Sequence, residues 1–330
     1  MNKPLLSFLE IINLSTEFLR KKGVPSPKCD VEWIVSFITK KKRVEIYLEF
    51  ENPVKLEYQN KIRELVIERG KRIPLQHIIG KVDFAGVELF CDNRALIPSP
   101  ETEYLTELIN ERIGKKLNGK ILDLGTGSGA ILIRFCMTNK LWDGIGLDKS
   151  SDAIDLANQN ASFHKLENVH FKKFNWDNQK LKNVYDIIVS NPPYLSIEEW
   201  EDAESEVRLY DPKIALVSTG GTTDLIKIIE HAKANLRKDG IIALETGLGH
   251  KGLADSQIEH VFERIVFNLI QKNKGHICIL PYSSITLPKT KYLENTINYS
   301  YLYGDYKISN RELLLSNNNL KYSLEPILEW

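Results

Sequence analysis

Apolar residues in the first part of the chain recur three and four positions apart, the spacing of one face of a helix. These positions are Leu5, Phe8, Leu9, Ile12, Val31, Ile34, Val35, Ile38, Ile62, Leu65 and Val66. Proline lacks a backbone donor and disfavours helix in the residue before it, so residues 23–27 and Asn52-Pro53 separate the groups. The pattern predicts a small helical domain over residues 1–75. Residues 80–98 alternate apolar and polar side chains around Gly86, which predicts a linking β-hairpin over residues 76–98.

From residue 99 to residue 283, short apolar runs alternate with helical patterns. The runs are GKILDLG (119–125), WDGIGLD (142–148), NVHFKKF (168–174), VYDIIVS (184–190), GIIALET (240–246) and HICILPY (276–282). Helices are expected through Arg134, from Ser151, from Thr223 to Leu236, and near residues 256–262. This alternation predicts an α/β fold with a doubly wound, mostly parallel sheet and helices on both faces.

Residues 284–330 form an extension in which the pattern weakens but aromatic residues are frequent. They are Tyr292, Tyr299, Tyr301, Tyr303, Tyr306, Tyr322 and Trp330. So many aromatics are unusual in a disordered tail. We expect an appended structured element, a strand pair with a packed terminus.

Charge and cysteine usage narrow the class of protein. Lys plus Arg and Asp plus Glu are both 44, and this zero net charge disfavours a protein that coats DNA regardless of sequence. The helical domain is locally basic at residues 40–43 and at Arg69, Lys71 and Arg72, which favours a solvated helix face over contact with an acidic or RNA-bearing partner. The cysteines, at positions 29, 91, 136 and 278, lack metal-ligand spacing, so we expect reduced core residues in a cytosolic protein.

Neither a metal site nor a membrane segment is expected. The histidines, at positions 77, 164, 170, 231, 250, 260 and 276, form no cluster in the sequence, which disfavours a metal or a histidine-dependent nucleophile. The amino terminus has only short apolar runs and an early Glu10, so no signal peptide is expected. No run of about 18 uncharged apolar residues predicts a membrane span.

The strongest local motif is ILDLGTGSGAILI at residues 121–133. It places an apolar strand and the carboxylate of Asp123 before glycines 125, 127 and 129, which open a helix. Glycines there let the backbone approach a ligand and expose amide groups at the helix start. Dinucleotide-binding and methyl-donor-binding folds share this pattern. Asp148, at the end of the next strand, could accept the ribose hydroxyls of either ligand.

A second motif follows the fourth strand as Ser190-Asn191-Pro192-Pro193-Tyr194. The Asn191 side-chain oxygen and the Pro192 carbonyl can each accept one N–H of an incoming NH2 group, while Tyr194 offers an apolar face to the planar group carrying it. A purely structural turn is the alternative. The motif favours a pocket for a planar amide or amine, and a sulfonium methyl needs mainly alignment with such a nitrogen.

The chain also resembles the HemK-type N5-glutamine methyltransferases, class I S-adenosylmethionine-dependent enzymes that modify the Gly-Gly-Gln loop of peptide chain release factors. The likeness is carried by RIPLQHIIGKVDFAG (72–86), LIPSPETE (96–103), DLGTGSGA (123–130), SNPPYL (190–195), SEVRLYDPKIAL (205–216) and GIIALETG (240–247). It implies a seven-stranded Rossmann-like sheet, S-adenosylmethionine as cofactor, a release factor as partner and a cytoplasmic location.

The resemblance also implies roles for individual residues. The implied S-adenosylmethionine site comprises Asp123, Gly125, Thr126, Gly127, Ser128, Gly129, Asp148, Trp176 and Asn191. Within this set, Asp148 would hold the ribose and Trp176 would flank the adenine. Residues Asn191, Pro192, Pro193 and Tyr194 would hold the glutamine side chain.

The sequence departs from the family at two positions and in its extension. Ser99 stands where the family usually has Arg, and Asn175 where it usually has a carboxylate. A diverged paralogue that methylates another amide, amine or carboxylate, on a peptide or a small molecule, is therefore one alternative.

A DNA adenine N6-methyltransferase is another alternative, because a flipped base presents a similar amine. Zero net charge, the lack of an obvious target-recognition domain and the segment 205–216 argue against it. A catalytically idle scaffold would need a broken site, yet Asp123, the glycines and Asn191 are present.

Overall fold

The computed structural model of the chain describes residues 5–221 and 223–246, and the backbone of strands at 276–281, 299–303, 306–309, 315–316 and 319–320. The chain divides into two compact units. We call the first the helical unit; it comprises the described residues of Met1–Val82, Cys91–Asn93 and Glu204–Tyr210. We call the second the sheet unit; it comprises those of Asp83–Phe90, Arg94–Ala203 and Asp211–Trp330. The expected boundaries at residues 75, 98 and 283 stay predictions.

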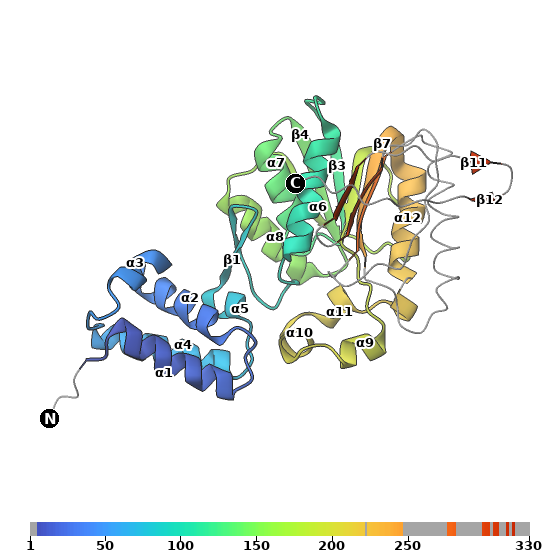
Figure 1. The fold of residues 1–330 in the computed structure, drawn as a ribbon. Helices are drawn as coiled ribbons and strands as arrows, with labels where there is room; N and C mark the ends of the chain where they lie inside the picture. Colours follow the sequence, from blue (N-terminus) through green and yellow to red (C-terminus); the bar gives the residue numbers. More distant parts are fainter. Residues whose placement is uncertain are drawn as a thin grey trace. The chain divides into compact units, whose positions relative to one another are not determined.

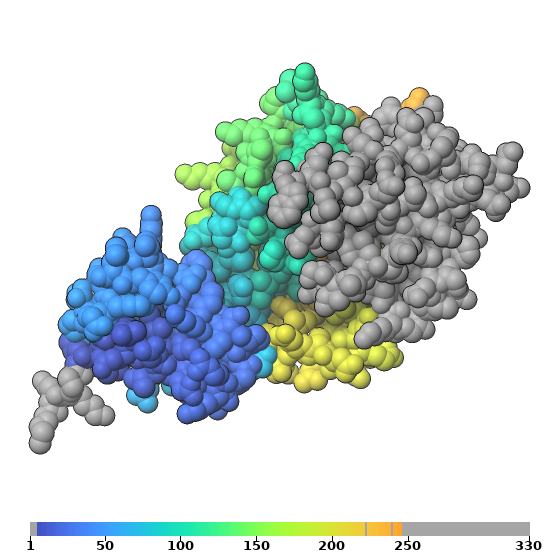
Figure 2. Space-filling view, viewed as in Figure 1, coloured from blue at the N-terminus to red at the C-terminus, as the bar shows by residue number. Residues whose placement is uncertain are grey.

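Helices make up the helical unit, and the apolar spacing predicts those at residues 8–21, 27–39 and 56–70 but not the others. The helices of this unit are α1 (Phe8–Lys21), α2 (Pro27–Thr39), α3 (Arg43–Leu48), α4 (Leu56–Gly70), α5 (Leu75–Ile79) and α10 (Ser205–Tyr210). Ser7 and Glu10 form a capping box at the start of α1, and Pro27 occupies the first turn of α2, where a missing donor costs nothing. The buried apolar side chains of α1, α2 and α4 form one core. In the space-filling view, the blue atoms of this part of the chain form one continuous surface (Figure 2).

Helix α10 belongs to the helical unit although it lies far along the sequence. Its Glu206 accepts hydrogen bonds from Arg69 Nη2 at 3.0 Å and from Arg72 Nε at 2.6 Å. Arg69 is itself buried and donates to Asp30 Oδ2 at 2.7 Å. The Tyr210 hydroxyl donates to the Lys71 carbonyl at 3.1 Å. A buried ion-pair network therefore fastens residues 204–210 to α4.

We predict that this network contributes stability at neutral pH and loses it in acid. Burial alone would raise the pKa of Glu206, but hydrogen bonds from Arg72 and Arg69, together with their charge, outweigh it and lower the pKa. A lowered folded-state pKa stabilises above the unfolded value of about 4.3, and this contribution disappears as the pH falls through the folded-state value. Thermal unfolding between neutral and acid pH should show wild type above Glu206→Gln at neutral pH and the two converging in acid. A constant difference across the range would contradict this.

The predicted hairpin is confirmed at residues 81–90, but residues 76–79 of the expected linker belong to helix α5 instead. Strands β1 (Lys81–Phe84) and β2 (Val87–Phe90) form a two-stranded sheet. The turn between them has positive φ at Ala85 (49°) and Gly86 (79°). Two such residues give the turn a twist that matches paired strands. The Asp83 side chain accepts the Gly86 N–H at 3.0 Å, which adds a local constraint.

The sheet unit is built on one mixed sheet in the order β10-β9-β8-β7-β6-β3-β4-β5. Its strands are β3 (Gly119–Leu124), β4 (Trp142–Asp148), β5 (Val169–Lys173), β6 (Tyr185–Ser190), β7 (Leu236–Thr246), β8 (His276–Pro281), β9 (Tyr299–Tyr303) and β10 (Tyr306–Ser309). Neighbouring strands pair in parallel from β5 to β9, and only β9 and β10 pair antiparallel. The predicted α/β class with a mostly parallel sheet is confirmed.

The strand number is a correction, because this sheet contains eight described strands where the family resemblance implied seven. The extension supplies β9 and β10, so the expected strand pair there is confirmed. A second short pair is formed by β11 (Leu315–Ser316) and β12 (Asn319–Leu320). The helix expected near residues 256–262 and the packed terminus lie outside the described residues.

Helices cover both faces of the sheet (Figure 1). Helices α6 (Pro100–Ile113), α7 (Ala130–Thr138) and α8 (Ser151–Phe163) lie on one face, and α12 (Thr223–Asn235) lies on the other. Shorter helices are α9 (Ile197–Glu201), α11 (Lys213–Leu216) and η1 (Thr219–Gly221). In the sheet, β3 lies between β4 and β6. The chain therefore runs from β3 to β4 and β5 on one side and then crosses back to β6 on the other side of β3. A crevice at the carboxyl ends of these strands is where open α/β sheets bind ligands.

The cysteine prediction is partly wrong. Cys91 and Cys136 are buried, as expected, but Cys29 is exposed on α2. Its helical position faces away from the stripe formed by Val31, Ile34 and Val35, which is why neighbouring apolar residues misled the prediction. The Cys278 side chain lies outside the described residues. In the part of the chain that the structure describes, no group of histidines, cysteines or carboxylates could hold a metal, and no helix meets the length and hydropathy needed to cross a bilayer.

Candidate functional site

A pocket in the sheet unit opens at the carboxyl ends of β3, β4 and β6. The predicted residues among its lining are Gly125, Thr126, Gly127, Ser128, Asp148, Trp176, Asn191 and Pro193. The other lining residues are Arg94–Pro98, Thr102, Ala130, Ile131, Lys149, Ser150, Ala153, Pro212, Ile214 and Ala215. The other predicted residues, Asp123, Gly129, Pro192 and Tyr194, are not part of this lining.

The glycine turn connects β3 to α7 with a left-handed backbone. Gly125, Gly127 and Gly129 have φ values of 81°, 52° and 81°, which side chains with a Cβ rarely adopt. A Cβ on Gly129 would lie 2.8 Å from the ring of Phe171. Backbone conformation therefore favours glycine at all three positions, and space also requires it at Gly129.

The amide groups of this turn are largely used within the protein, which corrects the expectation that the turn exposes them. The N–H groups of Gly125 and Thr126 donate to the Leu147 carbonyl at 2.8 and 3.1 Å. That of Gly127 donates to Asp148 Oδ2 at 2.9 Å, and that of Gly129 to the Thr126 carbonyl at 2.9 Å. A pyrophosphate would need these donors. The turn therefore fits a nucleoside without phosphates better than a dinucleotide.

Asp148 ends β4 with both carboxylate oxygens fixed. Oδ2 accepts the Gly127 N–H and Oδ1 accepts the Ser150 N–H, each at 2.9 Å. Burial raises the pKa of Asp148, and the surrounding N–H groups and the charge of Lys149 oppose this increase only in part. Each oxygen keeps a further lone pair. The carboxylate can therefore still accept ligand hydroxyls in the pocket.

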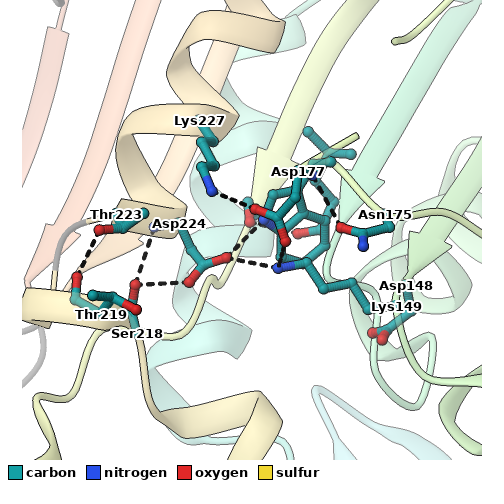
Figure 3. Close-up of polar contacts among 12 residues, drawn as sticks. Asp148, Lys149, Asn175, Asp177, Ser218, Thr219, Thr223, Asp224 and Lys227 are labelled. Carbon is teal, nitrogen blue, oxygen red and sulfur yellow. Dashed lines mark hydrogen bonds and ion pairs between the residues drawn. The ribbon is translucent and has the colours of Figure 1, made fainter. Parts of the chain in front are cut away.

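The indole of Trp176 is held on two sides. Its Nε1 donates to Asp224 Oδ1 at 2.7 Å, and Lys149 Nζ lies 4.1 Å from the ring centroid. Lys149 also pairs with Asp224 at 2.9 Å and with Asp177 at 3.0 Å. Figure 3 shows Lys149 with its ion pairs to Asp177 and Asp224. Trp176 is thus a rigid flat wall of the pocket.

The ionised form of Asp224 is stabilised by its hydrogen-bond donors. Burial alone would raise the pKa of Asp224, but hydrogen bonds from Lys149, Ser218 and Trp176 outweigh it and lower the pKa. The Ser218 hydroxyl donates to Asp224 Oδ2 at 2.7 Å (Figure 3). An ionised acceptor therefore keeps the indole in place.

Asp123 lies in β3 with no exposed surface. Burial raises the pKa of Asp123 to about 7; the nearby Thr126 hydroxyl opposes the increase and the charge of Asp148 adds to it. Neither carboxylate oxygen has a hydrogen-bond partner among the described residues. Asp123 is therefore a buried neighbour of the glycine turn and not a lining residue.

The Asn-Pro-Pro-Tyr turn begins directly after β6. Asn191 Nδ2 donates to Thr102 Oγ1 at 3.1 Å, and Thr102 Oγ1 donates to Glu245 Oε2 at 2.7 Å. The next segment is held by the Leu216 carbonyl, which accepts the N–H groups of Tyr194 and Leu195 at 3.2 and 2.9 Å. The turn is therefore fixed from two sides, at its first residue and at its last.

Comparison with known proteins identifies the family. A family model described as "PrmC N-terminal domain" matches residues 10–80, and one described as "Methyltransferase domain" matches residues 115–284. The release factor glutamine methyltransferase of Fusobacterium nucleatum is 38% identical over 72% of this chain and 68% of its own length. That of Chlorobaculum tepidum is 32% identical over 72% of this chain and 85% of its own. The chain belongs to the release factor glutamine methyltransferase family.

Solved structures match less closely. The ribosomal protein L11 methylase of Lactobacillus delbrueckii subsp. bulgaricus is 19% identical, covers 52% of this chain and 69% of its own, and has a TM-score of 0.35. The family confirms the resemblance read from the sequence and makes the chain a methyltransferase. The DNA adenine alternative is not favoured.

The two positions at which this family member departs from the family pattern have local roles. Asn175 Oδ1 accepts the Asp177 N–H at 3.0 Å, a turn that brackets Trp176. Ser99 is the N-cap of α6, and its hydroxyl accepts the Thr102 N–H at 3.1 Å.

We predict that Ser99→Ala lowers the free energy of unfolding by about 0.5–2 kcal/mol, the usual range for a lost N-cap. The side chain also lies 2.9 Å from Thr102 Oγ1, so the loss falls on the helix that carries Thr102. Denaturant unfolding measures the change, and Ser99→Thr, which keeps a hydroxyl, is the control. Equal unfolding midpoints for Ser99→Ala and wild type would contradict the capping role.

Several side chains around the site of this methyltransferase were not predicted from the sequence. Lys149 directly follows Asp148, a position that could have drawn attention to it. Thr102 and Glu245 lie within segments that carry the family resemblance, but nothing local assigns them a contact with Asn191. Asp224 has no sequence signal, since only the fold brings α12 to Trp176.

Proposed function

We propose that the protein transfers a methyl group from S-adenosylmethionine to the side-chain amide nitrogen of a glutamine in the Gly-Gly-Gln loop of a peptide chain release factor. The observation that carries the proposal is the orientation of Asn191. Its side-chain nitrogen is engaged by Thr102 at 3.1 Å, which leaves its oxygen as the acceptor at the pocket. The names of the relatives agree with this acceptor.

The residues of the pocket fit S-adenosylmethionine. Asp148 would accept ribose hydroxyls, the fixed face of Trp176 would lie against the adenine, and residues 125–128 would follow the remainder of the ligand. When bound, S-adenosylmethionine supplies an electrophilic methyl group on a sulfonium sulfur, which takes the electron pair of the breaking C–S bond. The internally satisfied glycine turn supports this ligand over a dinucleotide.

Asn191 and Pro192 would orient the glutamine nitrogen. The amide lone pair is delocalised, so the nitrogen is a poor nucleophile unless its lone pair is aimed at the reacting carbon. Accepting one N–H on Asn191 Oδ1 and the other on the Pro192 carbonyl aims it. Tyr194 would hold the plane of the amide, and one proton leaves the nitrogen for water after transfer, so no strong base is needed.

Mass spectrometry of a release factor tests the proposal. Incubation with the full chain and S-adenosylmethionine should add one methyl group to the Gly-Gly-Gln glutamine. A folded release factor should show a higher kcat/KM than a peptide of the loop alone, because remote contacts supply orientation. Methylation of DNA, with every host release factor unmodified, would overturn the proposal.

The full chain is needed for this test. Deleting residues 1–75 would remove Arg69 and Arg72, and with them the partners of Glu206 on α10. A loss of activity would then report damage to residues 204–210 as well as lost acceptor contacts. A cytoplasmic location is part of the proposal, because translation terminates there.

A further inference from the structure

A buried hydrogen-bond chain leads away from Asn191 to the end of β7. Asn191 Nδ2 donates to Thr102 Oγ1 at 3.1 Å, and Thr102 Oγ1 donates to Glu245 Oε2 at 2.7 Å. Thr102 is 5% exposed and Glu245 is 1% exposed, so water does not compete for these bonds. The three side chains come from the end of β6, the first turn of α6 and the end of β7.

We propose that Glu245 and Thr102 are positioning residues that set which end of the Asn191 amide faces the acceptor. This inference rests on the proposed function, since it concerns how Asn191 receives a glutamine amide. Neither side chain needs to touch the substrate for this role.

The hydrogen-bond donors along these three side chains determine the orientation of the Asn191 amide. An asparagine amide has nearly the same shape when its oxygen and nitrogen are exchanged, so only hydrogen bonds choose between the two orientations. In the structure, Thr102 donates its single hydroxyl proton to Glu245 Oε2. The Thr102 oxygen is then left with lone pairs alone. It accepts from Asn191 Nδ2, and Asn191 Oδ1 must face the opposite way.

The opposite orientation of the Asn191 amide would prevent the site from binding the glutamine amide. With Asn191 Nδ2 facing the pocket, two N–H donors would meet the N–H groups of the glutamine, and no hydrogen bond would form. A buried carboxylate is costly unless its partners are donors. Burial raises the pKa of Glu245 to about 7, with the hydrogen bonds from Thr102 and Asn191 opposing the increase and the charge of Glu101 adding to it. A carboxyl group buried at this cost is better explained by the hydrogen bond that it accepts from Thr102 than by packing.

Substitution of Thr102 separates the hydroxyl from the shape of the side chain. Thr102→Val keeps the shape and removes the hydroxyl, and we expect it to lower kcat about 10- to 100-fold, the scale for loss of alignment. The Kd for S-adenosylmethionine should stay within about twofold of wild type, because the glycine turn, Asp148 and Trp176 are unchanged. Thr102→Ser should recover most of the lost turnover, and Glu245→Met, which removes the acceptor of the Thr102 hydroxyl, should behave like Thr102→Val.

Thr106→Val is the matched control. Thr106 lies one turn further along α6, is 1% exposed and donates its hydroxyl only to the Thr102 carbonyl at 3.0 Å among the bonds described. Thr106→Val makes the same change in the same helix but keeps the side-chain hydrogen bonds between Glu245, Thr102 and Asn191. Turnover should therefore be unchanged. A second control places Thr102→Val in an Asn191→Ala background. No further loss is expected there, because both changes remove the same orientation.

Nuclear magnetic resonance provides a readout that does not depend on the acceptor. In protein with 15N-labelled asparagine, the side-chain signal absent from Asn191→Ala identifies Asn191, and Thr102→Val should shift it and speed its hydrogen exchange. If this coupling is seen but no release factor is methylated, the proposed function fails while the positioning role stands. If release factor is methylated and Thr102→Val keeps both wild-type kcat and an unshifted Asn191 signal, the positioning role is overturned. Additive losses in the Asn191→Ala background would likewise overturn it, since they indicate damage elsewhere.

Discussion

Asn191→Ala is expected to lower turnover of release-factor glutamine by about 10²-fold or more, the scale for a misplaced reacting group. Alanine removes the Oδ1 acceptor at the pocket but leaves the turn fixed at its far end, where Leu216 holds Tyr194 and Leu195. Most of the affinity for S-adenosylmethionine should therefore remain. Single-turnover kinetics measures the loss in the chemical step, and calorimetry measures the cofactor affinity.

Asn191→Asp sharpens this test. Aspartate keeps an acceptor at the pocket but removes the N–H group that Asn191 donates to Thr102 Oγ1. It also adds a carboxylate to a site that already holds the buried Glu245. We expect turnover to be low here too, although an acceptor remains. If Asn191→Ala transferred methyl groups at the wild-type rate, the Asn-Pro-Pro-Tyr turn would have no part in orienting the acceptor.

Asp148→Ala is expected to weaken S-adenosylmethionine binding by about 1.5 to 3 kcal/mol, the value of a hydrogen bond to a charged group. This corresponds to about a 10- to 150-fold increase in Kd. The carboxylate also accepts the N–H groups of Gly127 and Ser150, so its loss loosens the glycine turn as well. Isothermal calorimetry with S-adenosylmethionine and its demethylated product measures the change.

Asp155→Ala is the matched control for this experiment. Asp155 is an exposed carboxylate on α8 that does not line the pocket, so its removal should leave the affinity unchanged. Binding of NAD by the wild-type protein, with S-adenosylmethionine ignored, would contradict the proposed role of the pocket altogether.

Residues within one motif were predictable from the sequence, and contacts between distant motifs were not. The glycine turn, Asp148 and Asn191 each follow a strand directly, and the carboxyl ends of neighbouring parallel strands meet at one edge. The contact between Thr102 and Glu245 spans 143 positions and depends on α6 packing near the end of β7. No local pattern encodes that packing. The same is true of Asp224 beneath Trp176, which depends on where α12 lies.

The glycine turn shows a different reason for a wrong prediction. The glycines of the sequence lie where φ is positive, but the sequence does not show which groups accept hydrogen bonds from the backbone N–H groups of the turn. Leu147, Asp148 and Thr126 accept them, because the turn folds back on the end of β4. Hydrogen-bond partners in a turn are set by tertiary structure, whereas the tolerance for positive φ belongs to the residue itself.

Because α10 is part of the helical unit, that unit cannot be completed while the chain is still short. Arg69 and Arg72 leave the ribosome long before Glu206, which is 137 positions beyond Arg69. The nascent helical unit must therefore wait, with buried arginine side chains lacking this carboxylate, until β3 to β6 and the Asn-Pro-Pro-Tyr turn have been synthesised. For the same reason, a chimaera that exchanges this unit between relatives needs residues 204–210 from the same parent as residues 1–82.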